Sequence, residues 1–109
     1  MIRYIHNIIG IVLLQFLVSI TFTHAQSVTS ASGIVKDSIT GEPLPYVSVY
    51  FEGSTIGAMS DDNGHFTLQN DKGYVKLSAS SLGYETKSIR LKAGRKNDGL
   101  MLILKPAAF

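Results

Sequence analysis

Cysteine is absent from this sequence, and the net charge is small. Without cysteine the chain cannot form a disulfide scaffold, a thiolate zinc site, a cysteine nucleophile or a lipidated N-terminal cysteine. Its 10 Lys and Arg residues against 8 Asp and Glu residues leave a net charge of +2, which is too small a footprint for binding nucleic acid. The length of 109 residues allows one small domain.

Groups that carry out catalysis are also few. After the first 25 residues the sequence contains a single histidine, His65, whereas a zinc peptidase site needs about three protein ligands. It contains no Gly-x-Ser-x-Gly elbow and no phosphate-binding glycine loop. Asp61 and Asp62 would begin a calcium loop, but its last ligand position is Lys72 instead of Glu. The sequence therefore predicts no enzyme, no cofactor and no metal, with a looser calcium site that includes Asp71 as the alternative.

Residues 1–25 are predicted to be a signal peptide. Arg3 precedes an uncharged run of 15 residues at 8–22, and Thr23-His24-Ala25 offers small residues for cleavage after Ala25. A membrane span needs about 20 apolar residues, so an uncleaved anchor is the weaker alternative. The mature chain would begin at Gln26, with residues 26–30 as a short linker. An exported β domain without cysteine is typical of the periplasm or outer membrane of a Gram-negative bacterium, because small eukaryotic secreted domains more often use disulfides.

The remaining sequence favours strands over helices, because glycines recur at short intervals and no long window has helical apolar spacing. Seven short strands are expected, at residues 33–37, 46–52, 56–60, 65–69, 74–80, 86–91 and 100–105. Strands with one apolar face bury it by pairing two sheets, so an all-β, antiparallel sandwich is predicted. Its expected core consists of Val35, Val47, Val49, Phe51, Phe66, Leu68, Val75, Leu77, Ala79, Ile89, Leu91 and Leu102.

Five residues are predicted to shape the turns. We expect Gly33 to permit close packing at a strand start and Gly64 to take a positive φ at a hairpin tip. Gly41 and Pro43 fix a bend, and Gly83 allows a corner beside a tyrosine that covers the core edge. Each of these roles is structural.

The order of these motifs resembles the carboxypeptidase regulatory-like domain family. The resemblance covers residues 31–106 and is carried by SGIVKD at 32–37, TGEPLP at 40–45, VSV at 47–49, TIG at 55–57, DDNGHF at 61–66 and LGY at 82–84. It implies a transthyretin-like (prealbumin-like) sandwich of the Greek-key type and a non-catalytic module. Such modules are found at the N-terminus of TonB-dependent receptors and other secreted envelope proteins. Residues 107–109 would then be a tail or the start of a downstream region.

Two groups of residues are candidate interaction surfaces. Tyr46 and Tyr50 are expected on one outward face, where Tyr74 joins them, and aromatic rings of this kind stack on sugars or peptides. In the last strand, Met101 and Ile103 point at water if the leucines beside them point inward. The principal hypothesis is a structural or protein-interaction module, partnered by a downstream domain or an outer-membrane protein. The alternative is a carbohydrate- or peptide-binding module.

The segment between the last two predicted strands is basic. Lys92, Arg95 and Lys96 lie in it together with Gly94 and Asn97. A solvated hairpin loop is the simplest interpretation. Binding of acidic lipid headgroups or of a partner protein is the alternative.

Overall fold

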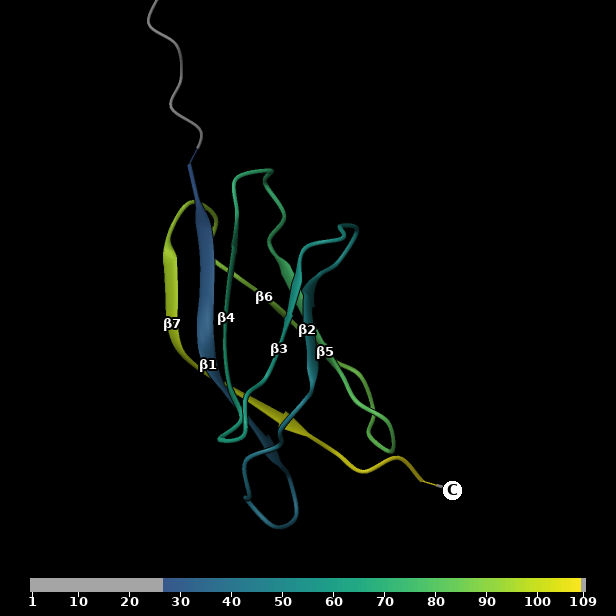
Figure 1. Cartoon of the computed structure of the whole chain (residues 1–109). Coiled ribbons are helices and arrows are strands. Elements are labelled where there is room, and N and C mark those ends of the chain that lie inside the picture. Colours follow the sequence, from purple (N-terminus) through teal and green to yellow (C-terminus); the bar gives the residue numbers. More distant parts are fainter. Residues whose placement is uncertain (1–26, 109) are drawn as a thin grey trace, which may run out of the picture.

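The computed structural model describes residues 27–108, so the predicted signal peptide lies outside the described residues. The described part of the chain forms seven strands in two sheets and contains no helix (Figure 1). Accordingly, no helix among these residues is long and apolar enough to cross a membrane. The predicted all-β sandwich of seven strands is confirmed.

One layer is a three-stranded sheet in the order β4-β1-β7 (Figure 1). Its strands are β1 (Thr29–Asp37), β4 (His65–Asn70) and β7 (Lys96–Leu104). The other layer has the order β3-β2-β5-β6. Its strands are β2 (Ser48–Phe51), β3 (Gly57–Met59), β5 (Lys76–Ser80) and β6 (Lys87–Arg90).

The pairing of β1 with β7 corrects the expectation of a purely antiparallel sandwich. These two strands run parallel, whereas the other strand pairs are antiparallel. The cause is the loop between β6 and β7, which crosses from one sheet to the other and lies beside the start of β1. There the Ser30 N–H donates to the Arg95 carbonyl, and the Gly94 N–H donates to Thr29 Oγ1. β7 therefore enters its sheet at the same end as β1.

Strand β1 is also longer than predicted. Thr29 and Ser30, expected in the linker, pair with Asn70 and Gln69 of β4. The side chain of Thr29 is buried, so the strand is anchored there by packing as well as by its ladder. The polar composition of the segment concealed this extension.

The core lies between the two sheets and closely follows the predicted alternation. Val47, Val49 and Phe51 point inward from β2 and the residue before it, and Leu102 does so from β7. Two predicted members, Val75 and Ile89, are only partly buried. The fully buried hydrophobic side chains and those nearly so are Ala31, Val35, Val47, Val49, Phe51, Phe66, Leu68, Leu77, Ala79, Leu91, Leu102 and Leu104.

Two glycines are required by close backbone contacts. Gly33 lies inside β1 instead of at its start, and a Cβ there would stand 2.0 Å from the Leu100 carbonyl oxygen of β7. Gly64 has φ +78°, and a Cβ there would stand 2.7 Å from the Val35 carbonyl oxygen. Gly41 and Gly83 also have positive φ, and Pro43 bridges to Lys36.

Candidate interaction surface

The outer face of the three-stranded sheet carries a small apolar patch. Ile34 of β1 lies opposite Met101 of β7, and the next pair on the same face of the two strands is Lys36 and Ile103. Met101 is 59% exposed and Ile103 37% exposed, while Leu102 and Leu104 are buried. The inward and outward positions of β7 are therefore those that its alternation predicts. We refer to Ile34, Met101 and Ile103 as the outer patch.

An open pocket lies beside the outer patch, between the end of β7 and the beginning of β6. Its volume is about 170 Å³, and Ile103 is its apolar lining residue. The other lining residues are polar or charged: Glu85, Thr86, Lys87 and Lys105. The backbone closes one end of this pocket, because the Glu85 N–H donates to the Lys105 carbonyl. Such a pocket can receive one side chain and is too small for a sizeable ligand.

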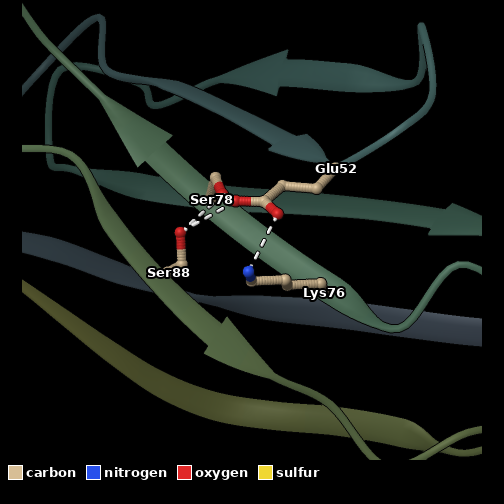
Figure 2. Close-up of polar contacts among 4 residues, drawn as sticks. All are labelled: Glu52, Lys76, Ser78 and Ser88. Atoms are coloured by element: carbon tan, nitrogen blue, oxygen red, sulfur yellow. Dashed lines mark hydrogen bonds and ion pairs between the residues drawn. The ribbon is translucent and has the colours of Figure 1, made fainter.

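The outer face of the four-stranded sheet holds a polar cluster centred on Glu52 (Figure 2). Ser78 Oγ and Ser88 Oγ donate to Glu52 Oε1 at 2.5 and 3.0 Å, and Lys76 Nζ lies 3.1 Å from Glu52 Oε2. The pKa of the Glu52 carboxyl group is lowered, mainly by the hydrogen bond from Ser78 and to a smaller extent by the contacts with Lys76 and Ser88. All of these groups satisfy one another. The cluster ties the residue that follows β2 to β5 and β6.

Contrary to expectation, Tyr74 does not join Tyr46 and Tyr50 on an outward face. Tyr46 has φ +58°, and its hydroxyl donates to Asp62 Oδ1 at 2.8 Å, which raises the pKa of Tyr46. Tyr50 is half-buried on β2, opposite Gly57 and Ser78. Tyr74 precedes β5 and packs against the core instead of facing outward.

The backbone of Tyr74 is held by the side chain of Asn70. Asn70 Oδ1 accepts the Tyr74 N–H, and Asn70 Nδ2 donates to the Tyr74 carbonyl. This hydrogen-bonded turn ends the β alternation before residue 74, so strand periodicity could not predict the direction of the ring.

A carboxylate–phenol pair that the motif analysis missed joins the ends of the two sheets. Tyr84 Oη donates to Asp37 Oδ2 at 2.6 Å, and Asp37 Oδ1 accepts the N–H groups of Ile39 and Thr40. The hydrogen bond from Tyr84, followed by those from the two N–H groups, lowers the pKa of Asp37. The same bond raises the pKa of Tyr84. Tyr84 packs on the core edge as predicted.

The acidic turn at residues 61–64 is a capped turn. Asp61 Oδ1 accepts the N–H groups of Asn63 and His65, and Asp62 accepts the Tyr46 hydroxyl. Among residues 27–108, no three or more His, Asp or Glu side chains gather where they could hold a metal ion. His65 is exposed on β4. The contacts of Asp61 and Asp62 therefore stabilise this turn.

The basic loop is an ordered structure. The side-chain amide of Asn97 donates to the carbonyls of Ser30, Lys92 and Arg95, while its oxygen accepts the Lys92 N–H. The loop is thus fixed to the start of β1. Lys92 and Arg95 are exposed on it, and Lys96, the first residue of β7, is exposed beside them.

Comparisons with known proteins agree with this architecture. A family model described as the CarboxypepD_reg-like domain matches residues 31–108. The TonB-dependent receptor SusC of Bacteroides thetaiotaomicron is 36% identical over 69 residues. This match covers 63% of the chain but only 7% of the receptor.

Two solved structures share the fold at low sequence identity. They are an N-terminal and a C-terminal interface mutant of a type II cohesin–X-dockerin complex from Acetivibrio cellulolyticus. Their matching chains have TM-scores of 0.58 and 0.52 at 16% and 18% identity. The matches cover 72% and 70% of this chain, and 58% and 56% of those chains.

Proposed function

The chain belongs to the CarboxypepD_reg-like domain family, and we propose that it is a non-catalytic protein-interaction module of an exported envelope protein. The proposal extends to its setting: the N-terminal part of a larger, TonB-dependent receptor-like protein of the outer membrane. The likeness to a short part of SusC supports this setting, as does the predicted signal peptide.

The observation that carries the interaction role is the exposure of Met101 and Ile103 on a strand at the end of its sheet. Exposed apolar side chains on an edge strand favour association with another polypeptide. A catalytic role has no comparable support. The serines of the Glu52 cluster have a carboxylate and no histidine beside them, and His65 lies away from them on β4 of the other sheet.

The alternative of carbohydrate binding depended on three tyrosines sharing one face. Since Tyr74 packs against the core and Tyr50 is half-buried, Tyr46 is the one well-exposed ring of the three, and the three rings do not form a shared stacking face. The outer patch therefore supports a protein partner better than a sugar.

Site-specific photo-cross-linking in a Gram-negative host tests the proposal. A photoreactive residue at position 101 is expected to form a discrete adduct with an envelope protein. The matched control is position 67 on β4, which is exposed on the same sheet. Adducts of equal yield from both positions, or none from position 101, would contradict the proposed role of the outer patch.

A further inference from the structure

The four strands that end the two sheets differ in how they discourage pairing with another chain. β3 is short, with 3 residues, β4 presents exposed polar residues, and β6 presents exposed cations. Short length and edge charges are the usual protections of an exposed strand. β7 has 9 residues, and its first half is protected by Lys96, Asp98 and a register shift before Leu100, whereas its second half carries Met101 and Ile103 on its outward positions. This second half is thus the least protected edge in the described part of the chain.

The backbone N–H and C=O groups of Met101 and Ile103 point away from β1, toward the side where a further strand would pair. The Ser38 N–H donates to the Leu104 carbonyl, so Leu104 pairs toward β1. Because the backbone groups of successive residues in a strand point to opposite sides, Leu102 also pairs toward β1, whereas Met101 and Ile103 face the opposite side. The Lys105 carbonyl faces that side as well, since it accepts the Glu85 N–H.

The segment before β6 already pairs with this side, but only beyond the end of β7. The Glu85 N–H donates to the Lys105 carbonyl, the Ala107 N–H donates to the Gly83 carbonyl, and Tyr84 bridges Pro106. β6 then diverges into the other sheet. The open pocket beside Ile103 lies where the two strands separate. Within residues 27–108, no strand pairs with the open side of Met101–Ile103.

The charges around this edge indicate what could pair there. Lys36 lies next to Ile103 on β1, while Lys87 and Lys105 line the pocket with it. The only carboxylate among the pocket-lining residues is Glu85. A basic partner would be repelled by this rim, and an acidic one would be attracted.

We propose that the Met101–Ile103 edge of β7 binds a partner by strand addition, and that the partner is an extended polypeptide with alternating apolar residues flanked by acidic ones. The backbone of the partner would bond to Met101 and Ile103, and its acidic side chains would meet Lys36, Lys87 and Lys105. Main-chain hydrogen bonds supply affinity in this mode, and alternate side chains supply specificity. The inference rests on the proposed function, because it names the surface and the partner chemistry of the interaction module.

Amide hydrogen exchange measured by NMR tests the inference, using protein purified from the envelope of cells that express the full chain. In the free protein, at a concentration where it sediments as a monomer, the amides of Met101 and Ile103 should exchange much faster than those of Leu102 and Leu104. The probe is the blocked peptide EVTVTVE, and its addition should slow exchange at Met101 and Ile103. Two matched peptides serve as controls: KVTVTVK, and EVTVTVE methylated on alternate amide nitrogens. Both should bind at least roughly fivefold more weakly, which corresponds to the loss of about one net hydrogen bond or charge contact.

Two substitutions separate the backbone from the side chain. Met101→Pro removes the N–H that faces the open side and should weaken EVTVTVE binding by roughly fivefold. Met101→Thr keeps that N–H and should weaken it less. Equal binding of the methylated peptide, tighter binding of KVTVTVK, or protected Met101 and Ile103 amides in the free protein would overturn the inference. The peptide measurements stand even if the proline variant does not fold.

The outcome also distinguishes this inference from the function on which it rests. Cross-links from position 101 without any effect of peptide methylation would refute strand addition and leave the interaction module standing. If position 101 forms no cross-links and no peptide binds, both are wrong.

Discussion

The hydroxyl of Tyr84 donates to the carboxylate of Asp37 at 2.6 Å, across a gap of 47 residues in sequence. Asp37 ends β1 in one sheet, whereas Tyr84 belongs to the turn that leads into β6 in the other. The same turn pairs with the end of the chain through Pro106. This one contact therefore joins both sheets and the C-terminal segment at the end of the sandwich.

We expect Tyr84→Phe to lower the thermal denaturation midpoint by a few degrees at neutral pH. The phenyl ring keeps its packing on the core edge, so the loss reports the hydrogen bond to Asp37. Tyr46→Phe is the matched control, because the Tyr46 hydroxyl also donates to a carboxylate, that of Asp62, but in an exposed position. An equal loss of stability in the two variants would show that burial of Asp37 adds nothing.

The same pair predicts the pH dependence of stability. The pKa of Asp37 is lowered in the folded protein, so its stabilisation is present above about pH 4 and is lost as the pH falls through the lower, folded value. The pKa of Tyr84 is raised, so its stabilisation is present below about pH 10 and is lost as the pH rises toward the folded value. Denaturation midpoints measured across pH should fall at both limits, and Tyr84→Phe should flatten both losses. A variant with the same pH profile as the parent would contradict this assignment.

Gly64 lies in the turn that crosses from β3 in one sheet to β4 in the other, so the expected hairpin tip is wrong, but the turn still predicts a large cost for a side chain. Gly64→Val forces a β-branched residue to φ +78° and sets its Cβ 2.7 Å from a backbone oxygen. It should lower the free energy of unfolding by roughly 3 kcal/mol. Gly41→Val is the control, because Gly41 has φ +71° but nothing within 4 Å of a Cβ. Its cost should be roughly 1 kcal/mol, measured by urea denaturation. Equal costs would mean that the contact with Val35 relaxes freely.

Alternation along single strands is what made most of this fold predictable. Because β side chains point to opposite faces in turn, the inward positions of β2, β4 and β7 follow from their residues alone. The direction of β7 does not follow, because it depends on where the loop after β6 crosses. Asn97 fixes that loop through contacts with Ser30, which is distant in sequence. Nothing in the local sequence of β1 or β7 therefore indicates that the two strands run parallel.

The candidate surface was predictable only in part, for the same reason. Met101 and Ile103 could be identified by their parity, but Ile34 could join them only once the register with β1 was known. The prediction for the tyrosines assumed that strand alternation continues through residues 46 and 74, but both of these residues lie outside the strands. At these two positions, turn geometry and side-chain capping override the alternation.

The exposed position of His65 predicts that it is dispensable. His65→Ala should change the free energy of unfolding by less than about 0.5 kcal/mol, as surface substitutions usually do. The cross-linking yield from position 101 should also be unchanged, because His65 lies on β4, at the far edge of the same sheet. Loss of a measurable hydrolytic activity in this variant would contradict the non-catalytic assignment.

Export predicts a defined N-terminus. The protein recovered from the envelope should begin at Gln26, because the uncharged run at residues 8–22 ends before the small residues of the cleavage site. N-terminal sequencing checks this, with allowance for cyclisation of Gln26. A protein that keeps Met1 and sediments with the inner membrane would instead be anchored there.

The outer patch predicts self-association when its partner is missing. The chain from Gln26 onward should bind an apolar dye and sediment as more than a monomer at high concentration, because Met101 and Ile103 expose apolar surface. Ile103→Lys should abolish both effects. It should also leave the free energy of unfolding within about 0.5 kcal/mol of the parent value, since the side chain points away from the core.

Thr67→Lys is the control for this last prediction. Thr67 is exposed on β4, so the substitution adds the same charge to the same sheet without removing apolar surface. If both variants dissociate the protein equally, the added charge causes the dissociation, and the loss of apolar surface from the outer patch does not. If the parent is already monomeric and binds no dye, β7 needs no covering partner, and the interaction role of the outer patch is wrong. Association that Ile103→Lys alone abolishes would make the patch the contact surface.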